Sequence, residues 1–274
     1  MFGDAIDTRK LPEIGASPFV PVPGPDLIRK IAGADITADE YRRSGVILAA
    51  DIYNQFVAAR GGPQGITIVD LGCGPGRIAS FLGQLFRDCD YLGVDVQGEM
   101  IGWASAALTT VVPNLKFRRV GSETDYAGSK SFEVPVAAET IELVVAASLF
   151  THLDEAGAIG YFREIRRMLQ HDGVGYLTYF SFDDEEARSF ARVAAERNSH
   201  VLTQSGKCWY WGSHGIFDTF YREEDLHLLA ADAGLRIANI RRGWWARTQR
   251  PTDEMAAFQD LMIVRRADFP SVLV

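Results

Sequence analysis

The chain has 274 residues, 47% of them hydrophobic, and its 36 Asp and Glu residues against 28 Lys and Arg residues give a formal net charge of −8. This length allows one large α/β domain with appendages or two small domains, and the hydrophobic content predicts a sizeable core rather than a disordered chain. The negative balance argues against nucleic-acid binding, which relies on a basic surface.

The cysteines indicate neither a disulfide framework nor a metal site. Cys73, Cys89 and Cys208 form no C-x-x-C pair and leave an odd count. No run of 18 apolar residues is present, and the N-terminus lacks the apolar segment of a signal peptide. We therefore expect a cytoplasmic protein with no membrane partner and no bound metal.

The N-terminal part is predicted to be an extended arm followed by helices. Prolines concentrated in residues 1–25 favour extended chain. A short helix fits 26–34, and a longer one is predicted from a capping box, Thr37 with Glu40, to about Arg60. The arm and helices define a region 1–62 that we expect to act as a roof.

A break at Gly61-Gly62-Pro63 precedes the predicted sheet domain, residues 63–274. Within it, residues 182–220 form an expected lid-like insertion.

The stretch Ile66–Arg77, ITIVDLGCGPGR, organises this domain. Its first half is short, apolar and β-branched, as a parallel strand covered on both faces is. Glycines then follow at every second position, where bare backbone can turn sharply and approach a ligand: Gly72, Gly74 and Gly76. Apolar residues at helical spacing predict a helix over 76–87.

The glycine spacing separates two kinds of cofactor site. A dinucleotide-binding turn has the pattern G-x-G-x-x-G, whereas this chain has G-x-G-x-G preceded by Asp70. An acid there is unfavourable beside a pyrophosphate and favourable beside an ammonium or sulfonium group. The motif VDLGCGPGR resembles the first motif of class I S-adenosylmethionine (SAM)-dependent methyltransferases.

A second acid follows one strand later. The apolar run Tyr91–Val94 ends in Asp95, and an acid at a strand end can accept both ribose hydroxyls. Nicotinamide enzymes use the same device, and a solvated turn aspartate is the remaining alternative. A helix is predicted over 98–112, with an edge strand over 115–120 after it.

The resemblance implies SAM as the cofactor and a set of residues around it. Asp70 would face the ammonium group, the glycine backbone would hold the methionyl part and Asp95 the ribose. The residue that contacts adenine stays open between Ser122, Glu123 and Asp125. The full expected set is Asp70, Gly72, Cys73, Gly74, Gly76, Asp95, Val96, Met100, Ser122, Glu123, Ala146 and Leu149.

The second half of the chain adds to the resemblance. A strand over 141–147 leads into S-L-F-T-H-L, and several methyltransferases have a similar S-V-F-T-H-L at this point. A helix, a turn at Asp172-Gly173 and a strand over 174–180 complete the unit. Ligands in open α/β sheets bind at the carboxyl ends of the strands, so His152 is the candidate general base. The alternative is a helix-start histidine bonded to backbone.

Candidate acceptor-binding residues come from several segments. A charged helix is predicted over 183–199 with Ala187, Phe190, Val193 and Ala194 on its apolar side, then an aromatic loop over 207–217. The loop's aromatic groups can stack on a sugar or ring, or can simply pack a lid. The candidate acceptor-binding residues come from the predicted roof helix, the end of the strand over 141–147 and this aromatic loop. They are Tyr41, Arg42, Ser148, Trp209, Tyr210, Trp211 and His214.

The C-terminal part is expected to close the sheet. A helix over 221–233 ends at Gly234, and strands are predicted over 235–245 and 258–265. The resemblance implies a Rossmann-like sheet of seven strands in the order 3-2-1-4-5-7-6, with strand 7 antiparallel and helices on both faces.

These expectations define a methyltransferase that moves the methyl group of SAM to a hydroxyl or amine of a small molecule, with a saccharide or natural product preferred. The alternatives are a SAM-binding protein that does not methylate, and a dinucleotide oxidoreductase, which the glycine spacing and the closing strands disfavour. The oligomeric state is not determined by the sequence.

Overall fold

The computed structural model describes residues 20–32, 36–62, 64–86, 88–121, 133–213, 216–247 and 258–270. Within them, seven strands form a mixed sheet in the order β3-β2-β1-β4-β5-β10-β9, and three more form a second sheet in the order β6-β7-β8. Strand β10 runs antiparallel to β5 and to β9. The predicted strand order is confirmed, because β10 and β9 are the expected strands 7 and 6.

The chain divides into two compact units. The first comprises residues up to Gly121 together with Ile141–Leu143, and the second comprises Ser122–Thr140 and Val144–Val274. In the first unit, β1 (Thr67–Leu71) pairs in parallel with β2 (Asp90–Asp95), which pairs in parallel with β3 (Leu115–Arg119). Its helices are α2 (Pro25–Ala32), α3 (Ala38–Arg60), α4 (Ala79–Leu85) and α5 (Gly98–Ala107).

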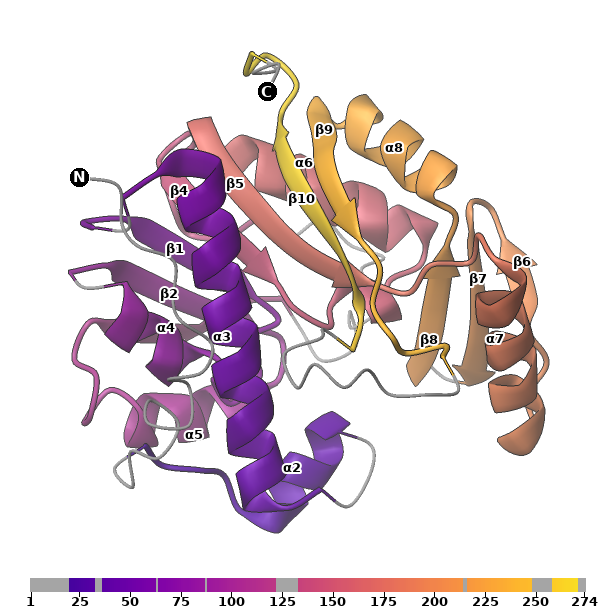
Figure 1. Cartoon of the computed structure of the whole chain (residues 1–274). Helices are drawn as coiled ribbons and strands as arrows, with labels where there is room; N and C mark the ends of the chain where they lie inside the picture. Colours follow the sequence, from indigo (N-terminus) through magenta and orange to yellow (C-terminus); the bar gives the residue numbers. More distant parts are fainter. Residues whose placement is uncertain are drawn as a thin grey trace. The chain divides into compact units, whose positions relative to one another are not determined.

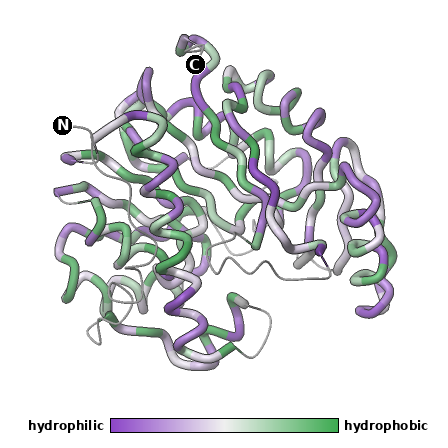
Figure 2. The backbone as a smooth tube through the Cα atoms, viewed as in Figure 1, coloured by the Kyte–Doolittle hydropathy of each residue, from purple (hydrophilic) through white to green (hydrophobic). Residues whose placement is uncertain are grey.

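Helix α3 begins at the predicted capping box and packs against α4 (Figure 1). The Thr37 hydroxyl accepts from the backbone N–H of Glu40, and the Glu40 carboxylate accepts from the backbone N–H of Thr37. A Cβ at Gly45 would lie 2.2 Å from the carbonyl oxygen of Arg77, so only glycine permits this close helix approach. Hydrophobic and hydrophilic stretches alternate along α3, as expected for a helix with one buried face (Figure 2).

Two helices of the first unit are shorter than predicted. Helix α4 begins at Ala79 rather than at residue 76. Gly72, Gly74 and Gly76 all have positive φ, so the chain can enter a right-handed helix only after Gly76. Helix α5 ends at Ala107 rather than at residue 112. The chain continues in turns, and Val111 is exposed instead of buried.

The second unit carries the rest of the large sheet. Strand β4 (Ile141–Ala146) begins in the first unit and ends in the second, which also holds β5 (Leu169–Tyr179), β9 (Leu235–Arg241) and β10 (Asp260–Arg266). Its helices are the short η3 (Phe150–His152), α6 (Glu155–Met168), α7 (Glu185–Arg197) and α8 (Glu223–Asp232). The second sheet consists of β6 (Thr203–Ser205), β7 (Cys208–Ser213) and β8 (Ile216–Tyr221).

The prediction of a turn at Asp172-Gly173 is wrong, because β5 includes both residues without interruption. Side chains from β10 hold this part of the strand. The Arg265 guanidinium donates to the carbonyl oxygen of Asp172 at 3.1 Å, and that of Arg266 donates to the carbonyl oxygen of Leu169 at 3.4 Å. An Asp-Gly pair, which locally favours a turn, is therefore kept extended by a partner distant in sequence.

The aromatic loop expected over 207–217 is also wrong, because the segment forms strands β7 and β8. Aromatic residues are good strand formers, so the same composition fits a strand pair. Trp209 lies opposite Phe220 in the register, and Trp211 lies opposite Asp218. Side chains alternate along a strand, so these four residues share one face of the small sheet.

Helix α7 buries a different side from the one predicted. Ala187, Ala191 and Ala195 are buried, whereas Phe190 and Val193 are 45% and 41% exposed. Alanines at a spacing of four let the helix approach the aromatic cluster around Phe182 closely. The small residues therefore decide which side packs, and the larger apolar ones lie at its margin.

Helix α8 starts after Tyr221, which ends β8, and Gly234 follows it in the left-handed conformation expected at a helix end.

Gly175 provides a test of the β5–β10 packing. A Cβ there would lie 2.4 Å from Cγ2 of Val264, so we expect Gly175→Ala to lower the free energy of unfolding by about 1–3 kcal/mol, measured by urea denaturation. Gly160→Ala in α6 is the control, because open space surrounds that position and alanine favours helix by about 0.5–1 kcal/mol. Equal stability of the two variants would contradict this packing.

Candidate functional site

The glycine turn of the first unit is held onto the end of β2 by hydrogen bonds. The backbone N–H groups of Gly72 and Cys73 donate to the carbonyl oxygen of Val94 at 2.9 and 3.1 Å. The N–H of Gly74 donates to Oδ2 of Asp95 at 2.9 Å. The turn and the acid predicted one strand later are thus a single structural element.

The glycines of the turn have different roles. A Cβ at Gly76 would lie 2.5 Å from Cδ1 of Leu108, so this glycine is required for packing. At Gly74 the nearest atom is Sδ of Met100 at 3.7 Å, so a Cβ would meet no clash there, and it is the left-handed φ of 54° that favours glycine. Gly74 therefore leaves bare backbone beside Met100, as expected of a surface that a ligand approaches closely.

Asp70 is buried below the turn, with its side chain 1% exposed. The Tyr91 hydroxyl donates to its Oδ2 at 2.6 Å. Burial raises the pKa of Asp70 to about 7, while the hydrogen bond from Tyr91 acts in the opposite direction. In this arrangement Asp70 acts on its surroundings through its charge and its bond to Tyr91, and it does not present a carboxylate at the surface.

Asp95 lies at the end of β2 and is 9% exposed. Its two oxygens accept from Gly74 and, at 2.8 Å, from the backbone N–H of Gln97. Burial raises the pKa of Asp95, and the backbone donors oppose this. These bonds fix the carboxylate at the strand end in one orientation.

The other expected cofactor residues are distributed over both units. Cys73 is buried, and burial raises the pKa of its thiol, so it is an unreactive packing residue. The carbonyl of Val96 accepts from Nε of Arg119. Ala146 is buried and Leu149 half-buried in the second unit, and Ser122 and Glu123, like Asp125, lie outside the described residues.

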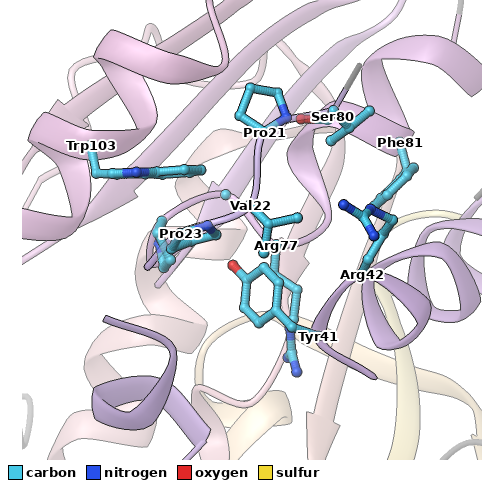
Figure 3. Close-up of a pocket in the computed structure, with 12 residues that line it drawn as sticks. Pro21, Val22, Pro23, Tyr41, Arg42, Arg77, Ser80, Phe81 and Trp103 are labelled. Atoms are coloured by element: carbon cyan, nitrogen blue, oxygen red, sulfur yellow. The ribbon is translucent and has the colours of Figure 1, made fainter. Parts of the chain in front are cut away.

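A small pocket opens in the first unit between the N-terminal segment, α3, the glycine turn, α4 and α5 (Figure 3). Three buried polar atoms of its lining have no hydrogen-bond partner among the described residues: the hydroxyl of Tyr41, Nε of Arg42 and the hydroxyl of Ser80. The lining residues are Val20, Pro21, Val22, Pro23, Tyr41, Arg42, Pro75, Gly76, Arg77, Ser80, Phe81 and Trp103.

The electrostatics of this pocket favour a negatively charged group. Arg77 is half-buried, and desolvation lowers its pKa, while Tyr41 and Asp70 oppose this. Burial raises the pKa of Tyr41, which keeps the phenol protonated as a donor. The sequence pointed to Tyr41 and Arg42 but missed Arg77, Ser80 and Trp103. Arg77 stands in the motif itself, whereas the other two have no sequence signal.

In the second unit, the end of β4 is built around Ser148, a non-glycine residue with φ of 60°. Its backbone N–H donates to Oγ1 of Thr178 at 2.7 Å, and its hydroxyl donates to Oε1 of Gln259 at 3.0 Å. These bonds stabilise a conformation that side chains disfavour. The expected substrate contact Ser148 thus has its hydroxyl engaged with Gln259.

His152 closes the short helix η3, with its side chain 31% exposed. Its Nδ1 lies 3.9 Å from Oδ1 of Asp218, whose side chain is 34% exposed. Burial raises the pKa of Asp218, and the charge of His152 opposes this rise. Sequence reasoning missed Asp218, because no motif links it to His152.

The aromatic candidates of the small sheet differ in their packing. Trp209 stacks on Phe182 with ring centres 4.9 Å apart, and Trp211 packs against the same cluster, which supports the packing alternative for both residues. Tyr210 and Trp211 are half-buried, and Nε1 of Trp211 is buried with no hydrogen-bond partner among the described residues. His214 lies outside the described part of the chain.

No helix among the described residues is long and apolar enough to cross a membrane. No group of three or more His, Cys, Asp or Glu residues in that part is arranged to hold a metal ion.

Comparison with known proteins supports one class. Residues 68–173 match a family model described as a methyltransferase domain. The match covers the glycine turn, Asp95 and His152, and it supports a class I SAM-dependent methyltransferase with SAM as its cofactor. The bare backbone at Gly74 and the fixed carboxylate of Asp95 fit this cofactor.

Solved structures share the fold at low sequence identity. The magnesium protoporphyrin IX methyltransferase of Synechocystis PCC 6803, solved with bound S-adenosylhomocysteine, is 15% identical, with a TM-score of 0.58 over 95% of this chain and 100% of that one. A SAM-dependent methyltransferase from Aquifex aeolicus is 16% identical, with a TM-score of 0.53 over 88% and 97%. One from Clostridium acetobutylicum is 14% identical, with a TM-score of 0.51 over 88% and 96%.

The buried Asp70 predicts a specific pH dependence of stability. Its pKa is about 7 in the folded state and 3.8 ordinarily, so the folded protein holds the proton over a range where the unfolded chain has lost it. Stability therefore falls as pH rises between these values, by up to about 1.4 kcal/mol per pH unit. Asp70→Asn carries no such charge, so we expect it to gain stability relative to the wild type over this range.

Urea unfolding without cofactor at several pH values measures this difference. Tyr91→Phe is the companion variant. Its missing hydroxyl no longer lowers the pKa of Asp70, so the loss of stability with rising pH should continue to a higher pH than in the wild type. Parallel pH profiles for Asp70→Asn and the wild type would show that Asp70 ionises normally.

Proposed function

We propose that the protein transfers the methyl group of SAM to a hydroxyl oxygen of a small molecule, with an amine as the alternative acceptor. The observation that carries this proposal is His152, a half-buried imidazole after β4 with a carboxylate beside it. Imidazole generally titrates near neutral pH and is the commonest general base in proteins. A hydroxyl, which does not release its proton in neutral water, needs such a base.

The residues that we propose to bind the cofactor lie mainly in the first unit. The backbone of Gly72, Gly74 and Gly76 would hold the methionyl part, and Asp95, kept in place by its backbone donors, would accept from the ribose hydroxyls with its remaining lone pairs. Met100 and Val96 would contact the nucleoside. Asp70, buried beneath the turn, would favour the positive charge of the cofactor at a distance. SAM supplies an electrophilic methyl group on a positively charged sulfur.

Further cofactor contacts are proposed from sequence position alone. They are Cys73 in the turn, Ala146 and Leu149 after β4, and Ser122 or Glu123 toward adenine.

The pocket at Tyr41 and Arg42 is proposed to receive a carboxylate, from either the methionyl part or the acceptor. Its unpartnered donors support this, because a buried donor without a partner costs about 1–3 kcal/mol until a ligand satisfies it.

For the acceptor we propose a saccharide or a natural product with a ring. Tyr210 and Trp211 support this, since half-buried aromatic rings can stack on a sugar or ring face. A cytoplasmic location is proposed from the three free, buried cysteines.

Cofactor binding is tested by calorimetry with SAM, S-adenosylhomocysteine and NAD. We expect the first two to bind and NAD not to bind. Asp95→Ala should weaken SAM binding roughly 10–100-fold, because it removes charge-assisted hydrogen bonds worth about 1.5–3 kcal/mol.

Asp90→Ala is the matched control, since this residue starts the same strand and forms an exposed ion pair with Lys116. NAD binding in place of SAM, or equal affinities for the two variants, would reject this assignment of the site.

The general base is tested with any acceptor that the wild type methylates. His152→Ala should lower the methyl-transfer rate at least about a hundredfold with SAM affinity unchanged, because general-base catalysis typically contributes that much. His227→Ala, at an exposed position of α8, is the control and should leave the rate unchanged. A loss of less than about tenfold for His152→Ala would exclude the base assignment.

A further inference from the structure

We propose that Gln259 binds the methyl acceptor: its side-chain NH₂ group donates a hydrogen bond to an acceptor oxygen that carries no proton, namely a carbonyl, carboxylate or ring oxygen. This inference rests on the proposed function, in which a small molecule is methylated beside the end of β4. It gives Gln259 the acceptor contact that the sequence predicted for Ser148.

Gln259 lies at the edge of the large sheet where ligands bind in folds of this kind. It directly precedes β10, whose first residue, Asp260, pairs with Tyr179 at the end of β5. Because β10 runs antiparallel to β5, its start lies beside the carboxyl end of β5. Open α/β sheets bind their ligands outside the carboxyl ends of the strands. The strand pairing therefore brings Gln259 to the ligand-binding edge within the second unit.

The oxygen of the Gln259 amide is fully engaged with two hydroxyl groups. The hydroxyl of Ser148 donates to Oε1 at 3.0 Å, and that of Thr178 donates to it at 2.6 Å. Oγ1 of Thr178 itself accepts the backbone N–H of Ser148 at 2.7 Å, so its single proton is available for Gln259. An amide oxygen has two lone pairs, and both are used here. The amide is therefore fixed with its oxygen toward the ends of β4 and β5.

The nitrogen of the same amide has no such partner. Among the described residues, Nε2 of Gln259 donates no hydrogen bond, and the residue is half-buried. Turning the amide over to satisfy Nε2 elsewhere would break both bonds to Oε1. Hydrogen bonds also polarise one another along a chain, so the two bonds to Oε1 make the N–H groups stronger donors. Gln259 thus presents two oriented donors to a ligand.

The turn that holds Gln259 also carries the proposed base. The hydroxyl of Thr151 donates to the carbonyl oxygen of Ser148 at 3.0 Å, and the backbone N–H of His152 donates to that of Leu149 at 3.0 Å. The residue that binds Oε1 of Gln259 is thus the start of the turn that ends at His152. An acceptor held by one oxygen at Gln259 would keep its reacting hydroxyl in a defined place beside this turn, and such positioning accelerates transfer.

The chemistry of the site selects the kind of atom that it binds. An NH₂ group only donates, and because Oε1 is occupied, Gln259 cannot reverse its role. An amine or another N–H at this point of the ligand would bring two donors face to face, which discriminates against such a ligand. A carbonyl, carboxylate or ring oxygen supplies lone pairs without a competing proton. The acceptor therefore combines a reacting hydroxyl with an oxygen of this kind.

The first test reads the amide directly and needs no turnover. Side-chain NH₂ signals are followed by NMR in ¹⁵N-glutamine-labelled protein saturated with S-adenosylhomocysteine, with Gln259 assigned by its loss in Gln259→Asn. The probes are methyl glucoside, 4-hydroxybenzoate and quercetin, which carry hydroxyls together with a ring oxygen, a carboxylate and a carbonyl respectively. We expect at least one of them to shift the Gln259 signals and to leave those of Gln204 in place. No shift of Gln259 with any of the three would overturn the proposal.

The second test measures methyl transfer to the probe that the wild type methylates. Gln259→Glu keeps an oxygen for the two hydroxyls, so its urea midpoint should match that of the wild type. Its KM for the acceptor should rise at least about tenfold, with SAM affinity within twofold, because the donor is lost and a negative charge faces the lone pairs of the acceptor oxygen.

Gln204→Glu is the matched control for this variant. It adds the same charge at an exposed position of β6 in the same unit, so KM and SAM affinity should stay unchanged. A glutamine that only supports the fold would be silent in Gln259→Glu, since the bonds to the hydroxyls remain. Equal acceptor KM values for the two variants would overturn the proposal.

The two tests separate the inference from the function beneath it. A probe that shifts the Gln259 signals but receives no methyl group from the wild type rejects the proposed function and leaves the contact standing. Methyl transfer with an unchanged KM in Gln259→Glu rejects the contact and leaves the proposed function standing.

Discussion

The first unit depends on the hydrogen bond from Gly74 to Asp95. It joins a turn of left-handed glycines to the carboxylate that ends the neighbouring strand, and the N–H groups of Gly72 and Cys73 complete the link at Val94. Because the turn is tied down at successive residues, its remaining bare backbone keeps one shape. A cofactor that binds there finds donors and acceptors already oriented, so little conformational entropy has to be lost on binding.

Polar groups with little access to solvent surround this turn, and a charged ligand would interact favourably with them. Asp70 is buried and Arg77 is half-buried, and desolvation displaces the pKa of each toward its neutral form. The hydroxyls of Tyr41 and Ser80 lack partners among the described residues. A folded domain retains such groups at a cost in stability, and a ligand with complementary charge relieves that cost.

The second unit shows a comparable arrangement around the end of β4. Ser148 holds a positive φ, and hydrogen bonds to Thr178 and Gln259 stabilise its backbone and hydroxyl there. That sharp turn directs the chain into η3, where His152 meets Asp218. The small sheet is thus a support for the strand end as well as an aromatic surface.

The sequence by itself determined the strand order, the glycine turn, the acid at the end of β2 and the cofactor, because these follow from local patterns: β-branched runs, bare backbone and a strand-end carboxylate. Only the tertiary structure decided that Asp70 is buried against Tyr91, that Asp172-Gly173 stays extended under Arg265, and that the aromatic segment pairs as β7 and β8. Asp218 reaches His152 for the same reason. Each of these depends on hydrogen bonds, strand pairing or charge contacts between residues far apart in the chain, and no local spacing encodes which distant partner a side chain will meet.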